Sequence, residues 1–432
     1  MFFSTNSLWG ATVKDRQGAV LDDRTKMEKS DRWIYNDIDS AFKTAKEKSK
    51  PLLVTLRCVP CLACIGMDTE IILENSRIST LLDQFICLRI INANKLDLTK
   101  FQFDYDLSFS VLTFNPDGTL YNRFGSWKHQ KDPEDKTTES FESALKGALA
   151  IHSDYPKNKA LLLGKQGKPH KYKSPLSIPG IKGKFKEELD WNSQVVRSCV
   201  NCHQINDSLN WDARDRKLTL APEQIYPYPS CEILGLTLGN EFPLRAEKIS
   251  SDSPADLAGF KNGDQILQVS GQFITTEADM SWALHNIPNS VNEIPILVQR
   301  ASRKGILKVK LSSNWKNNSD ISRRVGTWTK RALAFGGMKL EEIDNSTKRS
   351  FGLRPDSLAL EAKHVGQYNK HALAKRAGWK KGDILIEVEG RTNRMSESQL
   401  IGWILERRRP GQNLNGVAIR SGKKIKLTIP VQ

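Results

Sequence analysis

Three of the seven cysteines of this 432-residue chain fall within seven consecutive positions. Cys58, Cys61 and Cys64 follow directly after the apolar run from Leu52 to Leu56, and Cys61 and Cys64 are spaced as a Cys-x-x-Cys pair. That spacing suits thiol-disulfide exchange, metal binding or a structural role, and composition alone does not separate the three. Cys58 could also pair with Cys61, because those two residues have the same spacing.

A second Cys-x-x-Cys pair is followed at once by a histidine. Cys199, Cys202 and His203 have the order that attaches haem c, in which two thiols bind the vinyl groups and the histidine is the proximal iron ligand. No methionine that could be a sixth ligand occurs between His203 and Met280. A disulfide between the two cysteines is a second interpretation. Zinc bound by them with His203 as a metal ligand, and with Cys231, is a third.

Motifs of peptidases are absent from the sequence. It contains no Gly-Asn-Ser-Gly-Gly, Gly-x-Ser-x-Gly or His-Glu-x-x-His string, so the chain is predicted not to be a protease.

The elements around the first cysteines alternate between helix and strand. Ile38, Ala41, Phe42 and Ala45 have helical spacing and predict a helix, and apolar runs predict strands at 52–56 and 85–91. Residues 115–118, with the sequence Asn-Pro-Asp-Gly, predict the turn of a hairpin. A final amphipathic helix opens on the cap 137–140. This order predicts an α/β domain over residues 33–155.

The order of strand, short turn, Cys-x-x-Cys and helix resembles the thioredoxin fold. The resemblance places Cys61 at a helix N-terminus, where unpaired N–H groups and the helix dipole favour the thiolate. It implies that Cys61 is the nucleophile, Cys64 the resolving thiol and Cys58 an additional thiol. Two departures count against general disulfide exchange: Pro60 replaces the usual tryptophan, and no proline stands near Phe109 or Ser110.

The C-terminal half contains an internal repeat. Residues 253–272 align with residues 372–391, and three glycines of one copy, Gly259, Gly263 and Gly271, match glycines of the other. The shared pattern of Ala-Gly-aromatic-Lys, Gly-Asp and a later Gly resembles the turn of bacterial PDZ domains. The glycines supply turns that residues with a Cβ would strain.

The PDZ resemblance implies binding of C-terminal or extended peptides of client proteins as an added strand. In the first copy the carboxylate loop would be formed by Leu234, Gly235, Leu236 and Thr237. In the second copy the loop would contain Gly336 and Gly337. Ala278, Trp282 and Leu284 are expected to line the groove of the first copy.

The complete order resembles a bacterial family of thioredoxin-like and PDZ proteins, some members of which carry selenocysteine in place of an active-site cysteine. We therefore predict a multidomain protein in which an α/β thioredoxin-like domain precedes two mainly-β PDZ domains. The predicted segments are an N-terminal segment 1–32, the thioredoxin-like domain 33–155, a basic linker 156–225 with the Cys-x-x-Cys-His motif, PDZ domain 226–313, linker 314–326 and PDZ domain 327–432. The expected function is thiol-disulfide oxidoreduction with a redox partner protein and PDZ-bound clients. A non-enzymatic scaffold is the alternative.

Charge and hydropathy set limits on location and partners. The formal net charge is +16, with 65 Lys and Arg against 49 Asp and Glu. Lysines are dense from residue 157 to 186, but no nucleic-acid-binding motif accompanies them, so a solvated linker is favoured over nucleic acid. No apolar run is long enough for a membrane span. The motifs favour a periplasmic or exported protein, although the first residues do not have the form of a signal peptide; a cytoplasmic protein is the alternative.

Overall fold

The structure is a computed structural model that describes residues 15–59, 78–125 and 137–432. The predicted redox pair, Cys61 and Cys64, lies outside the described residues, as does Pro60. The chain forms two compact units. The first comprises residues 1–205 and 228–313, and the second comprises residues 206–227 and 314–432.

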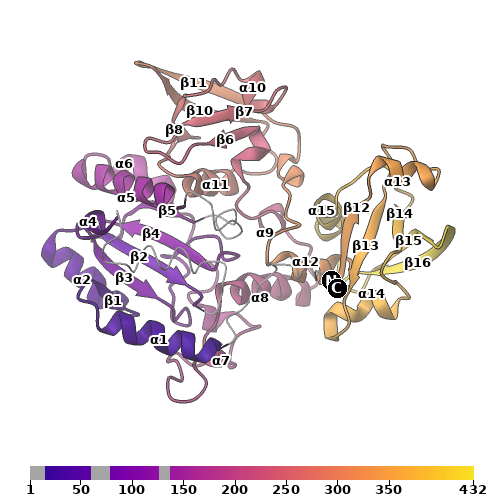
Figure 1. Cartoon of the computed structure of the whole chain (residues 1–432), viewed down its shortest axis with the longest axis horizontal. Coiled ribbons are helices and arrows are strands. Elements are labelled where there is room, and N and C mark those ends of the chain that lie inside the picture. The colour runs from indigo at the N-terminus through magenta and orange to yellow at the C-terminus, as the bar shows by residue number, and fades with distance from the viewer. Residues whose placement is uncertain (1–14, 60–77, 126–136) are drawn as a thin grey trace, which may run out of the picture. The chain divides into compact units, whose positions relative to one another are not determined.

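The first unit begins with a mixed five-stranded sheet in the order β1-β3-β2-β4-β5 (Figure 1). Its strands are β1 (Trp33–Tyr35), β2 (Leu52–Arg57), β3 (Ile86–Ile90), β4 (Phe109–Phe114) and β5 (Leu120–Phe124). β3 is parallel to both β1 and β2, whereas β4 is antiparallel to β2 and to β5. The carboxyl ends of β2 and β3 therefore meet at one edge of the sheet.

Helices cover the two faces of this sheet. They are α1 (Arg16–Glu28), α2 (Ile38–Lys48), α4 (Ser79–Leu82) and α5 (Thr137–Ser153). Alternate strand residues such as Leu53 and Val111 share a buried core with Phe141 and Leu145 of α5. On the opposite face the ring of Phe42 in α2 packs edge-on against Phe114. Such alternation is expected for strands buried on both sides.

The local sequence explains the ends of these elements. The side chain of Asp37 caps α2 by accepting from Ser40 N at 3.0 Å, and α2 ends where Ser49 adopts a left-handed conformation. In the hairpin, Asn115 N donates to Thr119 O at 2.8 Å and Gly118 has φ +91°. The predicted helix, strands and hairpin of this domain are thus present.

The segment predicted as a basic linker contains ordered elements. They are α6 (Lys159–Leu162), η3 (Leu163–Lys165), η4 (Pro175–Ser177), α7 (Val195–Ser198), α8 (Cys202–Asp215) and α9 (Pro222–Ile225). Residues up to 205 belong to the first unit and residues 206–227 to the second. The segment therefore joins two cores rather than forming a free tether, while the predicted domain boundaries stay predictions.

The rest of the first unit is the segment predicted as the first PDZ domain. It contains a four-stranded sheet, β11-β10-β8-β9, and a two-stranded sheet, β6-β7. Its elements are η5 (Cys231–Leu234), β6 (Leu236–Leu238), β7 (Ala246–Ile249), α10 (Pro254–Leu257), β8 (Gln265–Val269), β9 (Gln272–Phe273), α11 (Glu277–Asn286), β10 (Glu293–Arg300) and β11 (Arg303–Lys310).

A buried charge joins α11 to the thioredoxin-like domain. Asp279 and Lys165 are both fully buried, with 2.6 Å between carboxylate and Nζ. The same carboxylate accepts from Arg123 N of β5 at 3.2 Å. Because a buried charge needs a partner, this contact ties the position of α11 to the sheet.

The second unit contains the segment predicted as the second PDZ domain, built on one antiparallel five-stranded sheet, β12-β13-β14-β15-β16. Its elements are η6 (Trp315–Asn318), α12 (Thr327–Phe335), β12 (Met338–Glu342), α13 (Asn345–Ser350), β13 (Leu360–Val365), η7 (Asn369–Ala372), α14 (Leu373–Arg376), β14 (Ile384–Val388), α15 (Glu397–Arg407), β15 (Asn413–Arg420) and β16 (Lys423–Pro430). Its core also includes Leu220 and Tyr226, which precede the sheet by about a hundred residues.

The sequence repeat is also a repeat of local structure. Gly259 and Gly378, at matching positions, have φ of +87° and +93°. In the first copy Arg300 contacts Asp264 at 2.6 Å, and in the second Arg420 contacts Asp383 at 2.6 Å. The same turn is therefore closed by the same ion pair in both copies.

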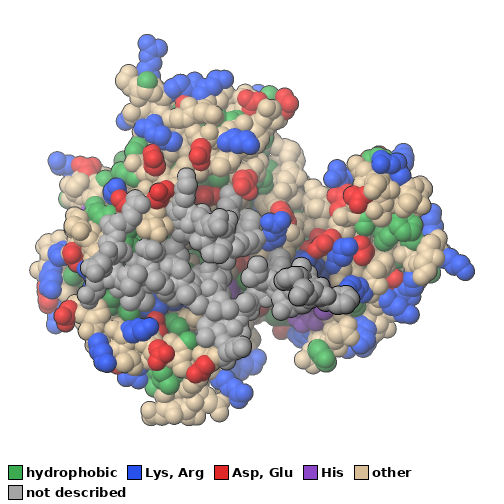
Figure 2. Space-filling model, in the orientation of Figure 1, with side chains coloured by type: hydrophobic (Ala, Val, Ile, Leu, Met, Phe, Trp, Pro, Cys, Tyr) green, Lys and Arg blue, Asp and Glu red, His purple; other side chains and the backbone are tan. Residues whose placement is uncertain are grey.

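Two observations concern the surface. Among the residues that the structure describes, no helix has the length and apolar character to cross a membrane. On the face shown in Figure 2, Lys and Arg side chains are interspersed with Asp and Glu. The positive charge is thus spread over that face, as a generally basic, solvated surface would have it.

Candidate thiol site

Cys58 stands at the carboxyl edge of the thioredoxin-like sheet. It follows the last residue of β2, and its N–H donates to Ser108 O, next to the start of β4, at 2.8 Å. The buried guanidinium of Arg57 donates to the Cys58 carbonyl and, at 3.5 Å, to Ser108 O. These bonds fix the backbone at the position from which the chain continues toward Cys61.

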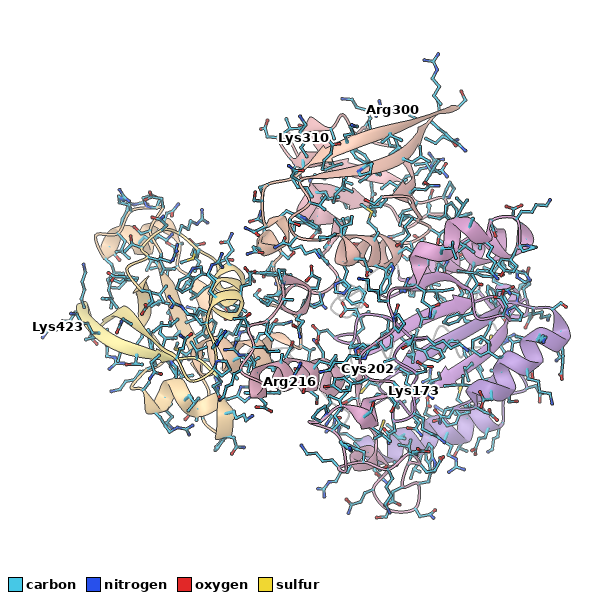
Figure 3. The ribbon with its side chains drawn as sticks, turned by 180° about the vertical axis from the view of Figure 1, so that it is seen from behind. Lys173, Cys202, Arg216, Arg300, Lys310 and Lys423 are labelled. Atoms are coloured by element: carbon cyan, nitrogen blue, oxygen red, sulfur yellow. The ribbon has the colours of Figure 1, made fainter. Side chains whose placement is uncertain are left out.

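Cys199 and Cys202 lie at the same edge, although they are more than a hundred residues away in sequence. They flank the turn between α7 and α8, and Cys202 is the first residue of α8 (Figure 3). The fully buried Asn94, just beyond β3, accepts from Val200 N at 2.7 Å and donates to Ser198 O at 2.8 Å. Asn94 thus fastens the second Cys-x-x-Cys turn to the thioredoxin-like domain.

One cavity of about 330 Å³ brings the three cysteines together. Its wall combines Cys58, Cys199 and Cys202 with apolar side chains from the ends of β2 and β3 and from residues 185–200. Three arginines also line it: Arg16, Arg57 and Arg197. The site is therefore an apolar chamber with three sulfurs and a cationic component.

Burial controls the protonation of the second pair. It raises the pKa of the Cys199 thiol to about 11, and Cys199 Sγ donates to Ile91 O at 3.2 Å. Burial, and then the proximity of Cys58, also raises the pKa of Cys202. Both residues are therefore protonated thiols at neutral pH. Cys87, whose pKa burial raises to about 12, is a core residue of β3 and lies outside this cavity.

His203 does not share the cavity with the two cysteines. Burial lowers its pKa, whereas Asp106 and a hydrogen bond with the backbone of Tyr105 act in the opposite sense. Its buried Nδ1 has no hydrogen-bond partner among the residues that the structure describes. The ring is therefore directed to the segment that precedes β4. None of these contacts tests covalent haem at Cys199, Cys202 and His203, which stays a prediction.

The zinc alternative gains no support from the described part of the chain. Cys231, its fourth expected ligand, begins η5, with Sγ 3.6 Å from the Glu277 carboxylate of α11. Within residues 15–59, 78–125 and 137–432, no group of three His, Cys, Asp or Glu is placed to hold a metal ion. Zinc at Cys199 and Cys202 therefore also stays an untested prediction.

The predicted carboxylate loop of the first copy includes the end of η5 and the start of β6. Gly235 has φ +82° and caps η5, with its N–H donating to Glu232 O at 2.9 Å. A Cβ at Gly235 would lie 2.1 Å from Ser253 Cβ, so substitution there would disturb the fold itself. The neighbouring Thr237 is exposed on β6.

One expected groove residue has another role. Trp282 donates from Nε1 to Gly164 O at 3.1 Å, and its ring lies 3.8 Å from the Arg123 guanidinium. It therefore packs α11 against the thioredoxin-like domain, and the prediction that it faces a peptide is wrong. Its helical position alone could not distinguish the two surfaces.

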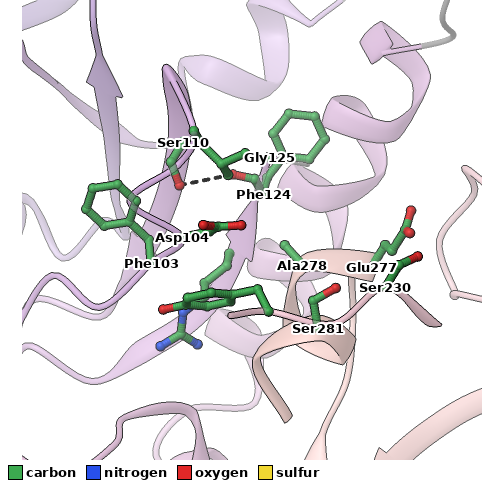
Figure 4. A pocket seen from close by; sticks show the side chains of 12 residues that line it. Phe103, Asp104, Ser110, Phe124, Gly125, Ser230, Glu277, Ala278 and Ser281 are labelled. Atoms are coloured by element: carbon green, nitrogen blue, oxygen red, sulfur yellow. Dashed lines mark hydrogen bonds between the residues drawn. The ribbon is translucent and has the colours of Figure 1, made fainter. Parts of the chain in front are cut away.

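A small pocket lies where the N-terminal half of α11 meets the thioredoxin-like domain (Figure 4). Ser110 of β4 and Gly125, just after β5, line it from one side, and Glu277, Ala278 and Ser281 of α11 from the other. Ser110 stands close to the position at which thioredoxins are expected to carry a proline, and its hydroxyl is 3.5 Å from Phe124 O. No pattern in the sequence indicated this junction.

In the second copy the predicted loop is used internally. The N–H groups of Gly336 and Gly337 donate to Ala332 O and Arg331 O at 3.1 and 3.0 Å and so cap α12. Glu397, the first residue of α15, pairs with Arg331 at 2.6 Å and accepts from Leu340 N of β12 at 2.7 Å. The edge strand and the glycine loop therefore already have internal partners.

Sequence reasoning missed four residues that organise these sites. Asn94, Asp279 and the pair Arg331 and Glu397 are buried polar groups with partners far away in sequence. Only the place of Asn94, directly after a predicted strand, gave a signal.

Comparisons with known proteins agree with part of this description. A thioredoxin-like family matches residues 33–116, so the chain contains a thioredoxin-like domain there. No curated protein matches the chain.

Solved structures that match include the serine endoprotease from Yersinia pestis, at 25% identity and a TM-score of 0.16, over 18% of this chain and 27% of that one. The HtrA-type protease AlgW matches with decapeptide at 16% identity and a TM-score of 0.23, and with tripeptide at 17% and 0.21. Both AlgW matches cover 45% of this chain, and 58% and 63% of theirs. The chain thus spans less than two thirds of these proteins.

Proposed function

We propose that this protein is a thiol-disulfide oxidoreductase that reduces disulfides of client proteins. The observation that carries the proposal is the gathering of Cys58, Cys199 and Cys202 in one cavity at the carboxyl edge of β2 and β3. Cys61 and Cys64 follow Cys58 in the chain and supply the nucleophile and resolving thiol that the thioredoxin resemblance implies. Such disulfide chemistry suits a periplasmic or exported protein.

We further propose that the first copy of the repeat recruits the client as a PDZ domain. The pocket between α11 and the residues near Ser110 and Gly125 supports this proposal, because it joins that copy to the sheet that carries the thiols. A peptide added beside β6 would then have its chain held within reach of the thioredoxin-like domain. The second copy is proposed to serve in packing, since Glu397 already engages β12.

Reduction of insulin disulfides by the full chain tests the function. The variant C61S should lose at least a hundredfold in rate, whereas C64S should accumulate a mixed disulfide with the client. C87A, outside the cavity, is the matched control and should retain the rate. Full activity in C61S would contradict Cys61 as the nucleophile, whereas no reduction by the wild type would favour the alternative of a non-enzymatic scaffold.

A further inference from the structure

We propose that Cys199 and Cys202 form a second redox dithiol that passes electrons to Cys58 within the shared cavity. This inference rests on the proposed thiol-disulfide function and adds to it an internal source of reducing equivalents. It assigns the second Cys-x-x-Cys pair a role different from cofactor attachment.

The first argument is position. Three separate stretches of chain end at the cavity: the exit of β2 with Cys58, the turn before α8 with Cys199 and Cys202, and the residues after β3 that hold this turn. The two hydrogen bonds of Asn94 to residues 198 and 200 prevent the turn from moving away as a free linker would. Cys58, the additional thiol of the first motif, therefore lines the same cavity as Cys199 and Cys202.

The second argument is the chemical environment. Cys202 is buried and Cys199 is half-buried. A dithiol and a disulfide are both uncharged, so this environment permits either state and opposes only the isolated thiolate. Arg57 and Arg197 at the cavity wall would stabilise a thiolate that forms transiently during exchange.

The reaction balances as three successive exchanges. In a slower route beside the one through Cys61, the thiolate of Cys58 first attacks a client disulfide, which forms a mixed disulfide and releases one client thiol. Cys202 then attacks the Cys58 sulfur, which forms the Cys58 to Cys202 disulfide and releases the second client thiol. Cys199 attacks Cys202 last, so Cys58 is released as a thiol and Cys199 is joined to Cys202. Two electrons and two protons pass from the dithiol to the client disulfide, which is the oxidant.

The intermediate disulfide can be trapped in the full chain. C199S removes the last nucleophile, so oxidation with glutathione disulfide, followed by alkylation and non-reducing digestion, should yield a peptide that links Cys58 to Cys202. C231S is the matched control, because Cys231 lies in η5 outside the cavity, and it should yield the Cys199 to Cys202 link instead. Absence of the Cys58 to Cys202 link in C199S would overturn the inference.

A stoichiometric measurement separates this inference from the proposed function. Pre-reduced wild type, freed of reductant, should reduce about twice as many insulin disulfides per chain as the double variant C199S/C202S. Equal yields from the two proteins would overturn the second dithiol while leaving the oxidoreductase intact. No reduction by either protein, together with a trapped Cys58 to Cys202 link, would support the dithiol and overturn the client activity.

Discussion

The two copies of the repeat keep the same turn but use the helix after it differently. In both copies an Asp and an Arg close the turn, and a hydroxyl caps the second helix, from Thr276 in the first copy and Ser396 in the second. In the first, α11 directs Asp279 to Lys165 of η3 and to the backbone N–H of Arg123 in β5 of the thioredoxin-like domain. In the second, α15 directs Glu397 to Arg331 of the helix that precedes its own sheet.

The difference shows how one module acquires two roles. Turn residues specify the fold of each copy, whereas a single buried carboxylate at or near the first turn of the helix specifies what the helix packs against. In the first copy that partner is another domain. In the second it is part of the same module, where the carboxylate also bonds to the edge strand.

The largest expected effect on stability comes from breaking the ion pair of the second copy, between Arg331 and Glu397. R331M would leave Glu397 buried without its cation, which should cost about 3 to 5 kcal/mol of unfolding free energy. Denaturant unfolding of the full chain, followed by the fluorescence of tryptophans, measures the loss. The double variant R331M/E397Q should recover most of it, and an R331M protein as stable as the wild type would contradict our account of this pair.

The matching change in the first copy is K165M, which leaves Asp279 without its cation. We expect a cost of about 3 kcal/mol, because Asp279 keeps its hydrogen bonds to Arg123 N and the Thr275 hydroxyl. Hydrogen exchange should quicken in α11 and residues 159–165 while unit 2 is unchanged. Faster exchange in α15 instead would show that the two helices are not independent.

Peptide binding should also distinguish the copies. A hydrophobic peptide with a free C-terminus and a photo-crosslinker, added to the full chain, should label residues 231–241 and 277–284 at least tenfold more than residues 336–342 and 397–404, a difference of about 1.4 kcal/mol. Mass spectrometry of the labelled peptides measures this ratio. The same peptide with an amidated C-terminus is the control. Equal labelling of the two copies would contradict the prediction that only the first copy binds peptides.

The ion pairs that close the two repeated turns should differ modestly in how much they stabilise the fold. D383N should destabilise by about 2 kcal/mol and D264N by about 1, because the side chain of Arg420 is 29% exposed whereas that of Arg300 is 50% exposed. Urea midpoints of the two variants test this order. A larger loss in D264N would mean that exposure does not set the strength of the pair.

The smallest effect is a pH dependence in the first copy. Burial opposes ionisation of Asp264, but the hydrogen bonds from Arg300 and the Lys261 backbone outweigh it and lower its pKa. A lowered folded-state pKa gives stability that is present above the ordinary aspartate pKa, about 3.9, and is lost as the pH falls through the lower value. The stability gap between wild type and D264N should therefore narrow below pH 4, and a constant gap down to pH 2 would contradict the assignment.

Local patterns predicted much of the fold and less of the site. The strand before Cys58, the hairpin at residues 115–118 and the repeated glycines each depend on neighbours in sequence, and each is present. The meeting of Cys58 with Cys199 depends on the hydrogen bonds of Asn94 to residues 198 and 200, more than a hundred residues away, and no periodicity in the sequence indicates such a contact. For the same reason, the sequence did not predict that Trp282 packs against Arg123.

The divided second unit has a consequence for synthesis. Leu220 and Tyr226 belong to a core that is completed by Ile429, about 200 residues later. At a synthesis rate of about 5 to 20 residues per second, roughly 10 to 40 s pass before the partners of these apolar side chains are made. The intervening residues 228–313 belong to the first unit and can fold meanwhile. A nascent chain paused near residue 320 should therefore engage chaperones through residues 206–227.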